Sequence, residues 1–521
     1  MRYLKTKQKI DPQPGTRAVV AKPISDKLQE NADDLHYLLE RCSDVVFKEF
    51  TFGPHRENRG LVIFFDGLVD KKEIETHLLK SLLLELNMAI NSCSSWPEHD
   101  VFNLVKDSIL SAAEVKSITT LQDICHSIGS GDTVLLIDGY DTALVAGTRG
   151  WEGRSIQTSE NEVVVRGPKE AFTETLRFNT ALLRRRIKST NFKIEAFVLG
   201  RITKTDVVLC YIDSIAPAQL VAEVKKRLGN IDIDGILDTG YLEEFLEDNH
   251  YTIFSQMEYS EKPDRVCGHL LEGQVCIMVD GSPIALIAPT SFPRFWIASE
   301  DYYERYLSGS LLRILRFVAF FTALLLPSLF VAAITYHQEM IPPPLYLTIA
   351  ATREEVPFPA FVEALLLEIT FELLREAGLR LPRSIGPAIS IVGALIIGDA
   401  AVKAGLVSTP MVVVIAFTGI ASFIVPSYNA GIAVRIARFG FLITAGFLGL
   451  FGIMIGLLLM LIHMTSLNSF GTSYLSPVAP FNKQEMTDII VRRPWFLTFL
   501  RPSMKGMENE VRQDNPNLPN K

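Results

Sequence analysis

The pattern of hydrophobic and polar positions changes near residue 310. Before it, short apolar runs alternate with charged residues, and after it long uncharged blocks dominate as far as Ser466. The first part therefore mixes the periods of amphipathic helices and of half-buried strands. Helices are predicted over 30–42, 71–86, 168–190 and 217–231, and strands over 60–67, 132–147, 191–213 and 273–289. This pattern predicts an α/β region of two small subdomains, 30–167 and 168–300, with the helical run 168–190 as the joint.

The second part has the composition of membrane segments. A helix needs about 20 mostly apolar residues to cross a bilayer. Four blocks meet or approach that length, and a fifth segment carries four glutamates. The five predicted spans lie near 317–336, 357–377, 385–405, 410–426 and 439–466. The fold class is thus an α/β N-terminal region followed by an all-α multi-span membrane domain over 301–480. Residues 1–29 are predicted to be a flexible extension, and 481–521 a tail with a disordered end from 502.

Arginine positions give a partial orientation. Arg305, Arg313 and Arg316 precede the first span and place the N-terminal region on the cytoplasmic side. With five spans, Arg435 and Arg438 also fall inside. The tail then falls outside although it is rich in Lys and Arg, which is contrary to the rule. Segment 357–377 has an alternative as a helix lying in the membrane interface.

Composition excludes several classes of function. The formal net charge is −8, which does not favour a nucleic-acid partner. Six cysteines occur without a C-x-x-C pair and are expected to be free thiols. No histidine motif for metal-dependent hydrolysis is present in the sequence. We therefore expect no catalytic site, no metal and no cofactor, and the chain is not predicted to be an enzyme.

The acidic segment forms an unusual helix. Glu368, Glu372 and Glu376 are four residues apart and make one stripe about 80° wide, whereas Glu363 lies about 140° from Glu368. Apolar residues cover most of the remaining surface, so the stripe must face water, a pore or basic partners. The helix is expected to begin at the Pro-Phe-Pro sequence Pro357, Phe358, Pro359, because proline suits a first helical turn.

A second charged helix is predicted over 385–405. Its small residues lie on one face, and the opposite face holds Val392, Leu395, Ile396, Asp399 and Lys403. One interpretation is an Asp399–Lys403 ion pair buried between helices. The other is a helix that lines a pore, with Leu395 and its neighbours as an apolar constriction. In the last span, the G-x-x-x-G sequence over 452–456 predicts close helix packing.

Several long stretches resemble one known family. Residues 231–248, 263–289, 292–306, 336–378, 380–408 and 461–480 are similar to the A subunits of bacterial spore germinant receptors, the GerA type. The likeness covers about 30–485 and includes the Pro-Phe-Pro motif. A related branch of the family comprises sporulation stage V membrane proteins.

The resemblance implies a function that the residue patterns do not. Family members are expected in the spore inner membrane, with a nutrient-binding multi-span B subunit and a C-subunit lipoprotein as partners. Homo-oligomers, expected to be pentamers, would form a nutrient-gated channel whose opening releases cations and triggers germination. Val392, Leu395, Ile396, Asp399 and Lys403 are then the pore and gate, and the acidic helix is a gating or vestibule element. The alternatives are a non-conducting scaffold, a stage V ion-release amplifier, and a secondary transporter, which the lack of internal repeats in the membrane half disfavours.

Overall fold

The contacts within the chain divide it into two units. The computed structural model describes residues 22–53, 56–80, 82–83, 102–103, 105–106, 115–150, 162, 164–380, 398–502, 504 and 506–513. Unit 1 comprises Met1–Leu246, Tyr259–Pro289 and Thr498–Lys521, and unit 2 comprises Glu247–Glu258 and Thr290–Leu497. The backbone therefore passes between the two units four times.

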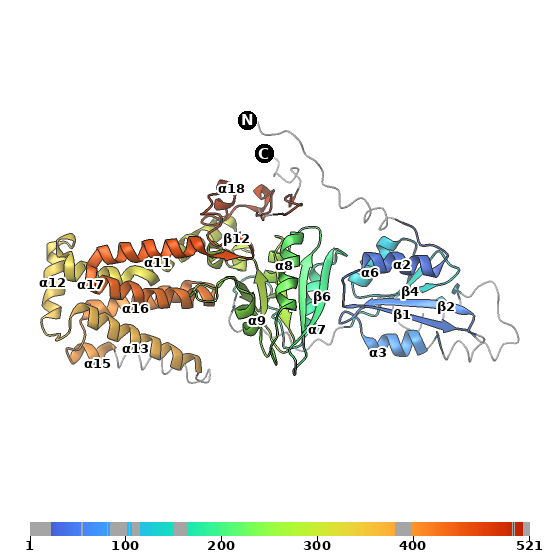
Figure 1. Ribbon diagram of the computed structural model, residues 1–521, viewed down its shortest axis with the longest axis horizontal. Coiled ribbons are helices and arrows are strands. Elements are labelled where there is room, and N and C mark those ends of the chain that lie inside the picture. The colour runs from blue at the N-terminus through green and yellow to red at the C-terminus, as the bar shows by residue number, and fades with distance from the viewer. Residues whose placement is uncertain are drawn as a thin grey trace, which may run out of the picture. The chain divides into compact units, whose positions relative to one another are not determined.

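The first half of unit 1 is a five-stranded sheet covered by helices on both faces (Figure 1). Its strands are β1 (Val45–Phe52), β2 (Asn58–Phe65), β3 (Val115–Ile118), β4 (Thr133–Ile137) and β5 (Ala143–Ala146), in the order β1-β2-β4-β5-β3. All neighbouring strands are antiparallel. One face packs on α2 (Leu28–Leu38) and α6 (Leu121–Gly129). The other packs on the π-helical turn η1 (Ile74–Leu79), which directly follows α3 (Lys71–Glu73). The apolar run in β2 is explained by this burial on both faces.

The second half of unit 1 contains another five-stranded sheet. Its strands are β6 (Phe192–Leu199), β7 (Thr205–Ile212), β8 (Glu258–Ser260), β9 (Val275–Val279) and β10 (Ala285–Ala288), in the order β6-β7-β9-β10-β8. Its helices are α7 (Leu176–Arg186), α8 (Ala218–Gly229), α9 (Thr239–Leu246) and α10 (Pro263–Leu270). Helices α7 and α10 share a buried core with one face of the sheet.

The two halves of unit 1 are structural repeats with the same fold. The strand order is the same in both sheets, and matching polar contacts recur. Asp138 Oδ1 accepts from the Leu28 backbone N–H at 2.9 Å where α2 begins, and Asp280 Oδ1 accepts from the Leu176 N–H at 3.0 Å where α7 begins. The side chain of Asn31 bonds the backbone six residues earlier, as does that of Asn179. The predicted two α/β subdomains are thus confirmed, and they form a duplication that the sequence patterns did not reveal.

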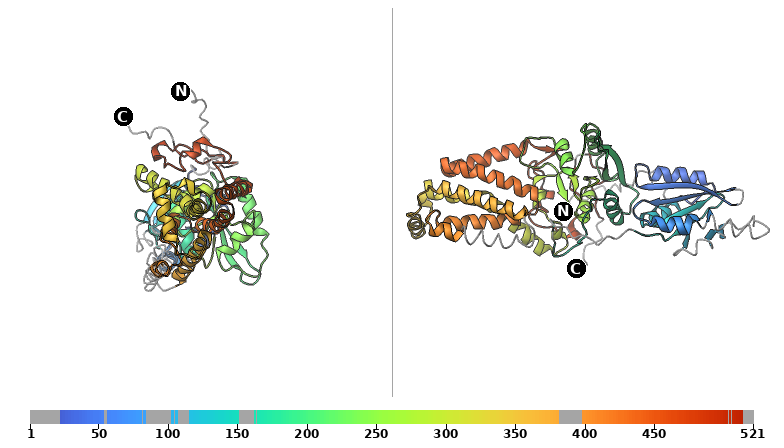
Figure 2. Two further views of the ribbon diagram at one scale, coloured as in Figure 1. Left: turned by 90° about the vertical axis from the view of Figure 1, so that its left-hand side faces the viewer. Right: turned by 90° about the horizontal axis from the view of Figure 1, so that it is seen from below.

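Unit 2 is a helical bundle whose longest helices lie side by side (Figures 1 and 2). Its helices are α11 (Tyr306–Tyr336), α12 (Pro343–Arg353), α13 (Ala360–Arg380), α15 (Gly398–Lys403), α16 (Thr409–Ile424), α17 (Tyr428–Ser466) and α18 (Lys483–Met486). Short elements are η3 (Phe292–Trp296), η4 (Ser299–Tyr302), η5 (Gln338–Met340), η7 (Trp495–Leu497) and the hairpin β11 (Asn468–Ser469) and β12 (Thr472–Ser473). Among the described helices, α11 and α17 are long and apolar enough to cross a membrane.

Helix α17 reverses direction at Gly449. This glycine has φ 63° and ψ −142°, a conformation outside the helical region. A Cβ at Gly452 would lie against the Thr444 carbonyl, and one at Gly456 would lie 2.8 Å from the Phe441 ring, so the two halves pack antiparallel. The predicted span 439–466 is therefore interrupted. The predicted close packing of the G-x-x-x-G sequence is confirmed, and its partner is the first half of the same helix.

The C-terminal segment returns to the start of the bundle. Asp488 Oδ1 lies 3.4 Å from Arg313 Nη1 near the beginning of α11. The five predicted spans stay a prediction, and the reversal at Gly449 adds one change of direction to them. The prediction of a disordered end from 502 is wrong over the described residues up to Gln513, because Met507 is buried in the core of the second repeat.

Candidate functional site in the helical bundle

Helix α13 packs against α11, α16 and α17 on one side and leaves Leu366, Ile369 and Leu373 exposed on the other. It begins directly after Pro359, whose carbonyl accepts from the Glu363 N–H at 3.1 Å, as the proline pattern predicted. Its apolar side joins a buried cluster contributed by α11, α13, α16 and α17: Val331, Ala360, Ala364, Met411, Ile415 and Leu442. Phe361 rests on Gly446 of α17, and Phe371 rests on Gly419 of α16. The acidic helix is therefore held by three neighbouring helices.

Glu363 stands apart from the other glutamates and anchors the start of α13. Its side chain is fully buried. Its Oε1 accepts from the Ser408 backbone N–H at 2.6 Å and from the Ser408 hydroxyl, and its Oε2 lies 3.6 Å from Arg353 Nε. A carboxylate with these partners fixes the start of α13 against the start of α16.

Two glutamates of the stripe face arginines of α17. Glu368 Oε2 lies 2.9 Å from Arg438 Nη2, and both side chains are 1% exposed. One turn further along α13, Glu372 Oε1 accepts from Arg435 Nη1 at 2.5 Å. Since residue numbers rise along α13 while they fall along α17, the helices are antiparallel here. We call Glu368, Glu372 and Glu376 with Arg435 and Arg438 the charge ladder.

The third glutamate of the ladder points outward. Glu376 Oε1 accepts from Arg380 Nε at 2.6 Å within α13, and these side chains are 56% and 80% exposed. Arg375, which lies between Glu372 and Glu376 in the sequence, donates to the Ser422 hydroxyl of α16 and lies over the Phe423 ring. Of the three surfaces that the stripe could face, Glu368 and Glu372 therefore meet basic partners within the chain.

The structure describes part of the predicted pore helix. Val392, Leu395 and Ile396 lie outside the described residues, so their role stays a prediction. Asp399 and Lys403 lie on α15 and form an ion pair at 2.6 Å, with side chains 58% and 74% exposed. The pairing four residues apart agrees with the sequence, but within the single chain this pair is not buried between helices.

The partners of the acidic helix were not found from the sequence. Arg353 and Ser408 had no assigned role, and Arg435 and Arg438 were considered only as markers of membrane orientation. The sequence does contain a signal for two of these partners, Arg435 and Arg438. Two arginines three residues apart in a long apolar helix need acidic partners, and the glutamate stripe was the available one.

Comparison with known proteins identifies the chain's family. A family model described as "Bacillus/Clostridium GerA spore germination protein" matches residues 33–504. The chain belongs to the GerA spore germination protein family.

GerA relatives match nearly the whole chain. "Uncharacterized membrane protein YfkQ" of Bacillus subtilis is 43% identical over 503 residues, covering 95% of this chain and 96% of that protein. "Spore germination protein KA" of Bacillus subtilis is 42% identical over 496 residues, covering 95% of this chain and 90% of that protein. The solved N-terminal domain of the A subunit of the Bacillus megaterium spore germinant receptor GerK3 is 34% identical, covers 52% of this chain and 98% of that chain, and has a TM-score of 0.42. With its apolar helices, the GerA chain is a membrane protein.

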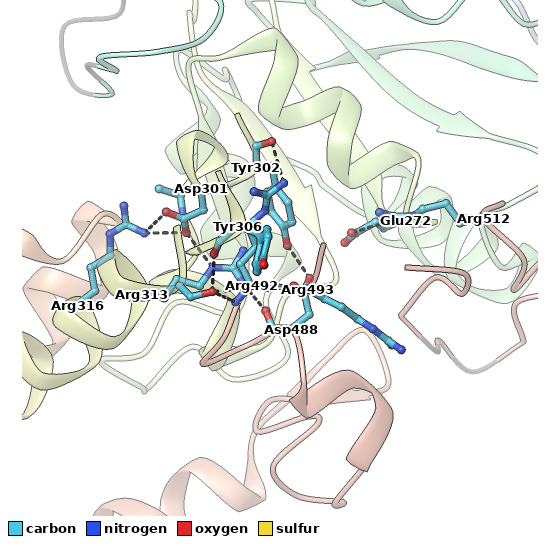
Figure 3. Close-up of polar contacts among 12 residues, drawn as sticks. Glu272, Asp301, Tyr302, Tyr306, Arg313, Arg316, Asp488, Arg492, Arg493 and Arg512 are labelled. Carbon is cyan, nitrogen blue, oxygen red and sulfur yellow. Dashed lines mark hydrogen bonds and ion pairs between the residues drawn. The ribbon is translucent and has the colours of Figure 1, made fainter. Parts of the chain in front are cut away.

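A second buried charge cluster lies at the base of the GerA chain's helical bundle (Figure 3). Asp301 is fully buried and accepts from Arg313 Nε at 3.0 Å and from Arg316 Nη1 at 2.6 Å. Asp488 accepts from the Tyr302 hydroxyl at 2.9 Å. Arg492 donates to the Glu304 carbonyl at 2.6 Å, and its backbone N–H donates to the Ser310 hydroxyl. The cluster ties the returning C-terminal segment to the first turns of α11.

Proposed function

We propose that this GerA-family chain is the A subunit of a spore germinant receptor and that copies of it form a nutrient-gated cation channel in the spore inner membrane. The names of its relatives support the germination role. In this proposal the N-terminal unit is cytoplasmic, a B subunit binds the nutrient, a C-subunit lipoprotein completes the receptor, and five copies of the chain surround the pore. Opening of the pore releases cations and starts germination.

The exposed Asp399–Lys403 pair is the observation that carries the channel proposal. Glu363 and Glu368, in the same helical unit, are buried beside basic or hydroxyl partners, whereas Asp399 and Lys403 are mostly exposed. Charged side chains in a membrane domain avoid lipid and face water or protein. An exposed pair at the end of the predicted pore segment 385–405 is therefore expected at a water-filled opening or against a neighbouring copy.

Planar bilayers test the conduction directly. Purified oligomers, with their size verified, should carry a cation current. Leu395→Ala should raise the open probability because it widens the apolar constriction. Leu347→Ala, at an exposed position on α12, is the matched control and should conduct as the unaltered protein does. Asp399→Asn should lower the preference for cations over anions. Verified oligomers that never conduct would overturn the channel proposal and favour the scaffold.

A further inference from the structure

The charge ladder has more acidic positions than basic ones. Three carboxylates repeat every four residues on α13, which is about one helical turn or 6 Å of rise. Two guanidiniums on α17 meet Glu368 and Glu372, and Glu376 remains on the surface. We propose that α13 has a second register, one turn along α17, in which Glu372 meets Arg438 and Glu376 meets Arg435.

The observed register leaves the buried ladder poorly bonded. Among the described residues, no hydrogen-bond partner is present for either Glu368 carboxylate oxygen or for the Arg438 Nε, Nη1 and Nη2 atoms. The 2.9 Å contact between them is thus an ion pair without hydrogen-bond geometry. A buried ion pair offsets its desolvation only when its geometry is good and its remaining polar atoms are bonded. The ladder therefore stabilises this register weakly compared with an ion pair that is fully bonded.

The second register keeps the number of ion pairs between the helices. Both registers contain two, because Glu376 enters as Glu368 leaves. Glu368 then moves one turn to the buried place of Ala364 and loses Arg438, so the second register is the less stable of the two. Glu376 exchanges only an exposed partner, Arg380, whose pairing is worth little in water. One-turn displacements of packed helices are an established way for a protein to hold two discrete states.

Glycines line the path of the displacement. Phe361 now rests on Gly446, and a shift of four residues along α13 would bring Leu365 to that place. Phe371 rests on Gly419 in the same way. Both places are filled by the phenylalanine rings in the observed register, and after the shift they would receive Leu365 and Arg375. Because glycine presents no side chain, each place has room for a large side chain from α13. A shift must break the contacts of Glu363 with Ser408 and Arg353. It must also break those of Arg375 with Ser422 and Phe423.

A shift of α13 would act on the predicted pore segment through the backbone. Helix α13 ends at Arg380, and the chain continues from there towards α15, which carries Asp399. The consequence for ion release rests on the proposed channel function, whereas the existence of the second register does not. The two therefore need separate tests.

Glu376→Gln separates a role in the ladder from a surface role. In spores carrying the full receptor, we expect the variant to assemble normally and its potassium release in response to mixed amino acids and sugars to fall about tenfold or more, since Arg435 would lack a carboxylate in the second register. Arg380→Gln removes the same surface pair but keeps the acidic position, and it should respond as the unaltered receptor does. Equal responses of the two variants would refute a ladder role for Glu376.

Cysteine cross-linking tests the register without any channel readout. Glu376→Cys with Arg435→Cys should be joined by a short bifunctional thiol reagent in the second register, because the two positions then face each other. A direct disulfide would need Cα atoms within about 7 Å. Adding Ser408→Ala removes one bond of Glu363, so the cross-linked fraction of the purified chain should rise several-fold. The matched control is Glu368→Cys with Arg438→Cys, whose cross-linking should fall, and single-cysteine variants account for the native thiols. A fraction unchanged by Ser408→Ala would overturn the second register, whereas a shift without conduction would overturn only the channel.

Discussion

Asp44 and Arg184 form a bidentate ion pair that is almost completely buried within unit 1. Arg184 Nε and Nη2 donate to the two Asp44 carboxylate oxygens at 2.8 and 2.9 Å, and the side chains are 2% and 1% exposed. Arg184 Nη1 donates to the Phe192 carbonyl, and the guanidinium carbon lies 4.3 Å from the centroid of the Phe65 ring. Burial alone would lower the pKa of Arg184, but the Asp44 carboxylate raises it above its ordinary value. The pair joins α7 of the second repeat to the segment before β1 of the first.

Asp44→Asn should destabilise unit 1 by about 3–5 kcal/mol, because it leaves a buried guanidinium without its counter-charge. For a domain of this size that loss corresponds to a fall in melting temperature of about 6–20 °C.

The cysteines provide a local assay of this unfolding. All six lie in unit 1, and Cys210 and Cys276 are buried in the second repeat. Burial also raises the pKa of the Cys276 thiol well above its ordinary value. Labelling of these thiols during heating therefore reports the unfolding of unit 1.

Two further variants decide whether the buried charge is the cause. Asp34→Asn breaks the partly exposed pair with Lys22 and should cost less than about 1 kcal/mol. The double change Asp44→Leu with Arg184→Met removes both charges and should recover most of the stability lost by Asp44→Asn. If Asp44→Asn melts within 2 °C of the unaltered chain, or if the double variant is less stable than the single one, the argument from burial is wrong.

Three smaller changes test other parts of the fold. Gly449→Ala should destabilise the bundle by about 1–3 kcal/mol, since its φ is positive and the new Cβ would lie 3.1 Å from Tyr336, and thermal denaturation in detergent measures this. Met507→Asp places a charge in the core of the second repeat and should raise thiol labelling at moderate temperature, whereas a labelling curve unchanged by it would contradict the packing of the C-terminal segment. Gly309→Ala puts a Cβ 2.8 Å from the Asp301 carbonyl and should cost about 1–3 kcal/mol, seen as faster proteolysis at the start of α11.

Local patterns in the sequence were sufficient for the class of fold and for several boundaries. The change near residue 310 marks a change in what surrounds the chain, so composition alone reveals it. Helix α13 begins after Pro359 because proline restricts its own backbone, which is also a local effect. The predicted helix 217–231 and strands 191–213 correspond to α8 and to β6 with β7 for the same reason.

Features that depend on distant contacts could not be predicted. Gly449, where the chain reverses, is one of several glycines in an apolar helix. Only its contacts with Tyr336 and His337, from another helix, distinguish it. Leu450 N–H donates to His337 Nε2, and the Tyr336 hydroxyl donates to the Gly446 carbonyl, which satisfies backbone groups at the break. The spacing of glutamates within α13 predicts a stripe but does not name its partners, because those partners lie in another helix.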